Sequence, residues 1–134
     1  MGSQQLLLIV LGVVLIGLMI IVGMTMFKDQ ASSTNRDSIS NDLQYFAVQV
    51  QKYYRRPLML GGGDHSFNGL TFAKIAKYAT NSNGVYVLSP DPGSTSDTFM
   101  RITGTGTNTG NNGTSSVQMR VTVWSDSTYF ESMN

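Results

Sequence analysis

The longest apolar segment of the chain covers residues 6–27 and contains no charged residue and no proline. Its most polar members are Thr25 and three glycines. As an α-helix it would be about 33 Å long, close to the ~30 Å hydrocarbon core of a bilayer. Its Leu, Ile, Val and Phe side chains each contribute about −0.4 kcal/mol to membrane insertion, which gives a total of about −6 kcal/mol. The pattern therefore predicts a helix that lies in lipid or in the core of an assembly of such helices.

Apolar residues in the following segment recur with helical spacing. Residues 30–38 contain no glycine or proline, so nothing there interrupts a helix. Pro57 should end the helix, because the residue before a proline is pushed out of the helical region. The sequence predicts one helix over residues 4–56, about 80 Å long, with an amphipathic second part. The apolar positions of that part are Ile39, Leu43, Phe46, Ala47, Val50 and Tyr54.

Residues 57–83 read as a connector with little regular structure. Three consecutive glycines at 61–63 predict a flexible, non-helical stretch, and Asn68-Gly69 predicts a turn. Thr71 is placed to cap a short helix, in which Phe72, Ile75, Ala76 and Ala79 would line one side. We expect a further turn over residues 81–84.

The remainder of the chain predicts β-strands. We expect strands at residues 85–89, 98–103, 116–124 and 128–130, of which the third alternates apolar and polar residues most regularly. Strands that follow one another without intervening helices predict an antiparallel sheet, with one face free to pack on the amphipathic helix. The predicted fold class is α+β, and the predicted segments are 1–27, 28–56, 57–83 and 84–134.

A low-complexity stretch of Gly, Thr, Asn and Ser covers residues 103–116. Because it has no apolar side chain to hold it down, we expect an exposed, mobile hairpin loop. It contains the sequon Asn112-Gly113-Thr114, so Asn112 is a candidate for N-glycosylation. The alternative is an unmodified loop residue.

Composition excludes several classes of function. The 134 residues carry a net charge of +1 with only 13% charged residues, so there is no basic stripe for nucleic acid. The absence of cysteine and the single histidine, His65, leave nothing for a disulfide framework or a zinc cluster. The glycine triplet lacks the ending of a P-loop, and Asp91 and Asp97 match no calcium motif. We expect no enzyme, no cofactor and no metal.

The start of the chain differs from a secretory signal peptide, which has a basic first region, an apolar core of 7–15 residues and a small-residue cleavage site. Residues 1–5 carry no basic side chain, and the apolar run is too long. We expect the segment to be retained. An ordinary membrane anchor needs positive flanking charge for its orientation, which residues 1–5 also lack.

This order of segments resembles the type IV pilins and the related pseudopilins: an apolar helix, its amphipathic continuation, a connector and an antiparallel sheet. The resemblance implies a leader removed by a prepilin peptidase and a mature, often methylated, amino terminus. If Met1 is that residue, Gln5 stands where most members have glutamate. Its carbonyl oxygen can still accept a hydrogen bond from an ammonium group. Cleavage after Gly2, leaving Ser3 first, is the alternative. The chain also lacks the proline and the C-terminal disulfide common in the family.

The resemblance further implies that the apolar segment forms the core of a helical filament of identical subunits. Gly12 and Gly17 would let neighbouring backbones approach closely, as small residues do between membrane helices, although their spacing is not that of GxxxG. Gly17 and Gly23 are the candidates for local unwinding of the helix. The expected assembly residues are Met1, Gln5, Leu8, Gly12, Leu15, Ile16, Gly17, Ile20 and Gly23.

We therefore expect the structural subunit of an extracellular type IV pilus-like filament, which lies in the cytoplasmic membrane before assembly. Its partners would be copies of itself, the prepilin peptidase and the pilus assembly machinery, with no nucleic acid. The alternatives are a pseudopilin of a secretion or DNA-uptake machine and a single-pass anchor for an extracytoplasmic binding domain.

Overall fold

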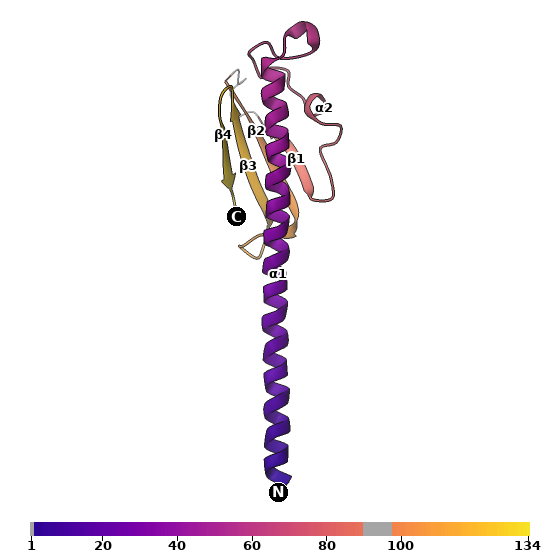
Figure 1. Ribbon diagram of the computed structural model, residues 1–134, viewed down its shortest axis with the longest axis vertical. Coiled ribbons are helices and arrows are strands. Elements are labelled where there is room, and N and C mark those ends of the chain that lie inside the picture. The colour runs from indigo at the N-terminus through magenta and orange to yellow at the C-terminus, as the bar shows by residue number, and fades with distance from the viewer. Residues whose placement is uncertain (1, 90–97) are drawn as a thin grey trace. The chain divides into compact units, whose positions relative to one another are not determined.

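The computed structural model of the chain describes residues 2–89 and 98–134. Its elements are α1 (Gly2–Arg55), the 3₁₀ turn η1 (Leu58–Leu60), α2 (Phe72–Ile75) and four strands: β1 (Gly84–Ser89), β2 (Phe99–Thr109), β3 (Ser116–Trp124) and β4 (Thr128–Ser132) (Figure 1). The chain divides into two compact units, residues 1–31 and residues 32–134. The first unit holds only the start of α1, and the second holds everything else.

The long helix agrees with the sequence prediction. α1 is unbroken from Gly2 to Arg55 and passes through Gly12, Gly17 and Gly23 as regular α-helix. It ends just before Pro57, as the steric restriction on the preceding residue requires. In the second unit the buried positions of α1 follow helical spacing, mostly three or four residues apart. They are Ser32, Asn35, Ile39, Leu43, Phe46, Ala47, Val50 and Tyr53.

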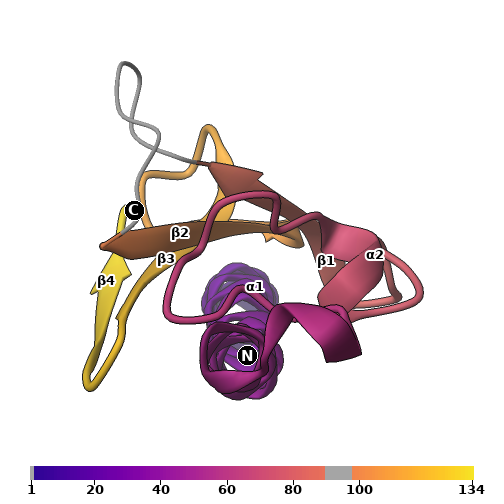
Figure 2. The ribbon, with the colours of Figure 1, turned by 90° about the horizontal axis from the view of Figure 1, so that it is seen from above.

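The four strands form one antiparallel sheet in the order β1-β2-β3-β4. Seen end-on, the sheet curves over one side of α1, with β1 and β4 at opposite edges (Figure 2). The fold is thus α+β, with the helix packed on a four-stranded antiparallel sheet. This confirms the predicted layering of helix on sheet.

One hydrophobic core lies between the helix and the sheet. Ile39, Leu43 and Val50 of α1 are fully buried, as are Val121 and Val123 of β3. The alternation predicted for residues 116–124 is confirmed except at Thr122: Val117, Met119, Val121 and Val123 are all buried, and Thr122 is buried as well. Phe46 packs edge-on against the rings of Phe72 and Tyr86, at centroid distances of 5.2 and 4.8 Å.

The prediction of an exposed loop over residues 103–116 is wrong in extent. β2 continues to Thr109, and the turn is confined to residues 110–115. Gly104 and Gly106 are buried on the face of β2 that meets α1. A Cβ on Gly104 would lie 2.7 Å from Cγ2 of Ile39, and one on Gly106 would overlap Oδ1 of Asn35. These glycines are therefore core residues that let the backbone approach the helix closely.

The connector also differs from its prediction. α2 has only four residues, ends before Ala76, and its N-cap Thr71 makes no side-chain capping hydrogen bond. The glycines at 61–63 are held in place, because the amides of Gly61, Gly62 and Gly63 donate to carbonyl groups of Leu58, Pro57 and Tyr53 at 2.9–3.1 Å. Gly62 and Gly63 are buried. Gly62 and Gly63 therefore pack closely against Arg56 and Tyr53 at the end of α1, where we had expected a flexible linker.

Candidate assembly surface

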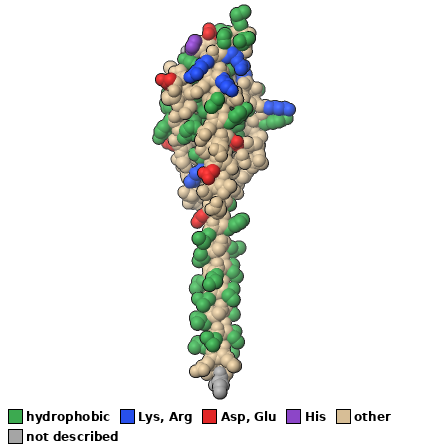
Figure 3. Space-filling model, viewed as in Figure 1, with side chains coloured by type: hydrophobic (Ala, Val, Ile, Leu, Met, Phe, Trp, Pro, Cys, Tyr) green, Lys and Arg blue, Asp and Glu red, His purple; other side chains and the backbone are tan. Residues whose placement is uncertain are grey.

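The first unit exposes an apolar surface. Between residues 6 and 27 the large hydrophobic side chains are exposed to fractions from 47% at Leu15 to 75% at Phe27. Hydrophobic side chains cover this part of the chain in Figure 3. Among the described residues, one helix, α1, is long and apolar enough to cross a membrane, by length and composition. An apolar surface of this size is typical of a segment that meets lipid or other protein.

Most of the predicted assembly residues share one side of α1. At 100° per residue, Gly23 lies about 20° from Gly12, three turns further along the helix. Gly17 is about 140° away from Gly12 and therefore faces another direction. Met1 lies outside the described residues. Of the predicted assembly residues, those within about 80° of Gly12 are Gln5, Leu8, Leu15, Ile16, Ile20 and Gly23.

The glycines of this helix have no role in packing within the described chain. A Cβ built on Gly12, Gly17 or Gly23 would have no described atom within 4 Å other than its chain neighbours and the nearby backbone of its own helix. Each glycine costs a helix about 1 kcal/mol relative to alanine. At Gly23 the missing side chain contributes to a concavity of about 370 Å³, lined by Leu15, Leu18, Met19, Val22, Gly23 and Met26. Unlike Gly104 and Gly106, these glycines are free to receive a neighbouring chain.

The one hydroxyl within the apolar run is satisfied inside the helix. Oγ1 of Thr25 donates to the carbonyl oxygen of Val22 at 2.8 Å. A polar group without a partner would be costly in an apolar environment. The surface of residues 6–27 therefore carries no side-chain donor that lacks a partner.

Sequence reasoning missed a polar cluster between α1 and β1 in the second unit. Oδ2 of Asp42 accepts hydrogen bonds from the Tyr86 hydroxyl at 2.5 Å, and from the Asn81 and Asn83 side-chain amides at 2.8 and 2.9 Å. Nδ2 of Asn35 donates to the carbonyl oxygen of Asn83 at 2.9 Å. The sequence does show two asparagines, Asn81 and Asn83, in the turn at residues 81–84. Only the fold shows that both bind Asp42 on the helix.

This cluster shifts two pKa values in opposite directions. Burial opposes the charge on Asp42, but the hydrogen bonds from Asn83, Tyr86 and Asn81 outweigh it and lower the pKa of the carboxyl. Burial raises the pKa of the Tyr86 phenol, and its hydrogen bond to the Asp42 carboxylate adds to the effect. The phenol therefore stays protonated and the carboxylate charged at neutral pH. The pair therefore fastens β1 to the helix through a charge-assisted hydrogen bond.

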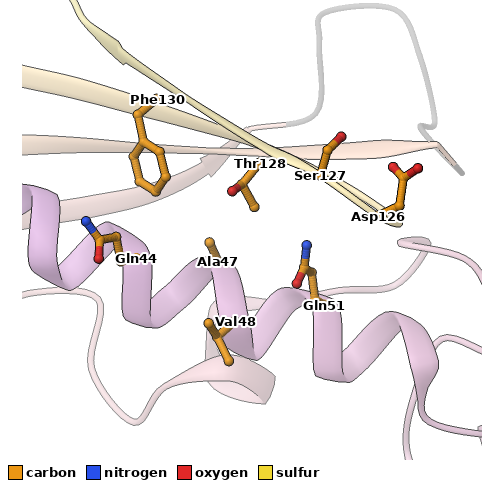
Figure 4. Close-up of a pocket in the computed structure, with 8 residues that line it drawn as sticks. All are labelled: Gln44, Ala47, Val48, Gln51, Asp126, Ser127, Thr128 and Phe130. Carbon is orange, nitrogen blue, oxygen red and sulfur yellow. The ribbon is translucent and has the colours of Figure 1, made fainter.

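A pocket of about 540 Å³ lies beside the same helix (Figure 4). It lies between α1 and the segment at the turn from β3 to β4, and its one charged lining residue is Asp126. A single carboxylate provides neither an acid–base pair nor a nucleophile with its base. The residues that line it are Gln44, Ala47, Val48, Gln51, Asp126, Ser127, Thr128 and Phe130.

The other residues singled out from the sequence lie apart from one another. Asn112 is exposed in the 110–115 turn, where its Oδ1 accepts from the amides of Thr114 and Ser115, both at 3.1 Å. His65 is exposed in the connector, with its ring edge-on to Tyr54. Among the described residues no three His, Cys, Asp or Glu side chains gather as metal ligands. Asp91 and Asp97 fall outside the described residues.

Comparison with known proteins gives no match: no protein-family model, curated protein or solved structure matches the chain. The described residues define an α+β fold with an exposed apolar helix at its N-terminal end and a small sheet domain.

Proposed function

We propose that the chain is the structural subunit of an extracellular filament of the type IV pilus kind, and not an enzyme. The single observation that carries this proposal is the apolar surface of residues 6–27, whose large side chains are 47–75% exposed. Before assembly this segment would lie in the cytoplasmic membrane. In the filament it would lie among copies of itself, with the sheet domains outside.

The energy available supports polymerisation. Burial of a large apolar side chain is worth roughly 1.5 kcal/mol, so the whole segment provides at most about 30 kcal/mol. Helices that point the same way and repeat with an axial offset make head-to-tail contacts. Such contacts do not close into a ring, and the product is an open filament.

Two glycines of α1 are the proposed points of close contact between neighbouring helices in the filament. Gly12 and Gly23 lie on the same side of α1, and a Cβ at either would meet open space beyond its own stretch of helix. Their cost in helix propensity, about 1 kcal/mol each, is offset if a neighbouring helix packs closely against them. Membrane insertion alone would be served better by leucine at both positions, because leucine is more apolar.

Electron microscopy of material sheared from cells that produce the chain tests the proposal. We expect long fibres from the wild type, and at least a tenfold loss of fibres when Gly12→Leu and Gly23→Leu are combined. This variant stays apolar enough to enter a membrane. The matched control is Val10→Leu with Val14→Leu, which adds apolar volume on the opposite side of α1 and should leave fibres in place.

Three results would contradict the proposal or redirect it. Wild-type cells that yield only membrane-embedded monomers would support the single-pass anchor. Short stubs tied to a secretion or DNA-uptake machine would support the pseudopilin. Unchanged fibres from the Gly12→Leu and Gly23→Leu variant would show that close approach at these glycines is not how the helices pack.

A further inference from the structure

Three large apolar side chains project from the 3₁₀ turn that follows α1. We call Leu58, Met59 and Leu60 the apolar tip. They are 69%, 98% and 70% exposed, and in Figure 3 hydrophobic side chains gather at this end of the second unit. Single exposed apolar residues are ordinary, but three in succession mark an interaction surface.

The backbone beneath the tip is held by an internal set of hydrogen bonds. The amide of Leu60 donates to the carbonyl oxygen of Pro57 at 3.0 Å, and that of Gly61 to Leu58 at 2.9 Å. The chain then returns to the helix, where the amides of Asp64 and His65 donate to the carbonyl groups of Arg56 and Tyr54 at 3.0 and 2.8 Å. The tip is therefore a fixed projection. Backbone groups bonded in this way lower the cost of entering an apolar medium.

Basic side chains come directly before the tip in the chain. Lys52, Arg55 and Arg56 are exposed in the last turns of α1 and directly before Pro57. The acidic residue of this stretch is Asp64, also exposed. Three cations against one carboxylate leave a net charge of +2 over residues 52–65, with His65 neutral. Figure 3 shows Lys and Arg side chains next to the hydrophobic ones at this end.

We propose that the apolar tip and its arginines bind an anionic lipid surface. Leu58, Met59 and Leu60 would enter the headgroup region, while Arg55 and Arg56 pair with lipid phosphates and carboxylates. Membrane attachment becomes stable when an apolar anchor and a basic patch act together, and both are present here. This role is additional to filament formation and does not depend on it.

A second copy of the chain suits the tip less well. A stable protein interface buries about 800 Å² on each partner, more than three side chains can supply. A lipid surface needs no matching shape, and its negative potential complements the net positive charge of the tip. Binding to a lipid surface should depend on lipid charge, whereas binding to a second copy should not. The experiment below compares neutral with anionic lipid for this reason.

The test uses the full chain held by its apolar helix in nanodiscs of phosphatidylcholine. Labelled nanodiscs are mixed with large vesicles and floated on a density gradient. The vesicles are either pure phosphatidylcholine or contain about a third phosphatidylserine. We expect the loaded nanodiscs to float with the anionic vesicles and not with the neutral ones, and 0.5 M salt to weaken the binding. Empty nanodiscs set the background.

Two variants separate the two parts of the surface. Arg55→Gln with Arg56→Gln should weaken binding about 30-fold, as expected for two basic residues near an anionic surface. Leu58→Ser, Met59→Ser and Leu60→Ser together should weaken it at least as much. Lys77→Gln with Tyr78→Ser, which removes a cation and an exposed ring elsewhere in the second unit, is the matched control. Circular dichroism confirms that each variant is folded.

Each other outcome overturns the proposal. Equal binding to neutral and anionic vesicles would show that lipid charge does not contribute to the binding. Binding that survives either tip variant places the contact elsewhere. Association of loaded nanodiscs with one another in the absence of vesicles, abolished by the Leu58–Leu60 variant, would show that the occupant is a second copy.

Discussion

The Tyr86 hydroxyl on β1 donates a 2.5 Å hydrogen bond to Oδ2 of Asp42 on α1. This contact joins the edge strand of the sheet to the helix, next to the fully buried Leu43. The side-chain amides of Asn81 and Asn83 share the same oxygen. Asp42 therefore ties both β1 and the turn before it to the helix, and loss of its charge should loosen both.

Asp42→Asn should lower the free energy of unfolding by about 1.5–3 kcal/mol, because charge-assisted hydrogen bonds are lost. Tyr86→Phe should cost about 1 kcal/mol, since Asp42 keeps two other donors. Denaturant unfolding of the full chain in mild detergent measures both changes. Asp37→Asn, at an exposed carboxylate on the same helix, is the control and should change little. A double-mutant cycle without coupling between Asp42 and Tyr86 would contradict this account.

The same pair predicts how stability depends on pH. The pKa of Asp42 is lower in the folded chain than its ordinary value of 3.8, so its contribution is present above about pH 4 and is lost as the pH falls toward the folded pKa. The pKa of Tyr86 is raised, so its contribution is present below about pH 10 and is lost as the pH rises beyond that. The stability difference between wild type and Asp42→Asn should therefore shrink from pH 5 to pH 3. A difference that stays constant over this range would rule out the mechanism.

Gly104→Ala should destabilise the second unit by about 1–3 kcal/mol through overpacking. The new methyl group would lie 2.7 Å from Ile39 and 3.0 Å from the ring of Tyr86. Thr107→Ala, at an exposed position of the same strand, is the control and should change stability far less. Thermal unfolding followed by circular dichroism compares the two. Equal melting temperatures for both variants would show that β2 does not approach the helix as closely as described.

Leu15→Asp or Ile16→Asp should abolish fibres while residues 28–134 still fold. A carboxylate at the centre of the apolar run costs about 3 kcal/mol on an insertion scale, and it would remain unpaired between packed helices. Microscopy of sheared material reports fibres, and circular dichroism of the purified variant reports the sheet. Normal fibres from either variant would contradict a filament core built from this helix.

Asn112→Ala should open the turn at residues 110–115. Oδ1 of Asn112 accepts two backbone hydrogen bonds there, and Nδ2 donates to Oγ of Ser115 at 2.5 Å. Loss of such turn contacts costs about 1 kcal/mol, and faster amide exchange at Thr114 and Ser115 would reveal it. The intact mass of the natural product tests the sequon separately, because an unmodified mass would exclude glycosylation at Asn112.

The long helix could be predicted because its signals are local. Helical spacing from Ile39 to Val50 and the stop at Pro57 depend only on residue order and backbone sterics, and α1 agrees with them. The third strand was equally clear, since alternation has a period of two. The apolar run of residues 6–27 is of the same kind, because its length and composition alone identify it.

The arrangement of partners far apart in the chain could not be read in this way. Gly104 and Gly106 looked like loop residues, and they became core residues because α1 packs against β2 and leaves no room for side chains. Asp42 and Tyr86 are separated by 44 positions, and only the packed sheet brings them together. Leu58–Leu60 read as part of a connector, and their exposure follows from the glycines that fold back onto the end of the helix. Periodicity reports which face of an element is buried, whereas contact between elements depends on how the whole chain packs.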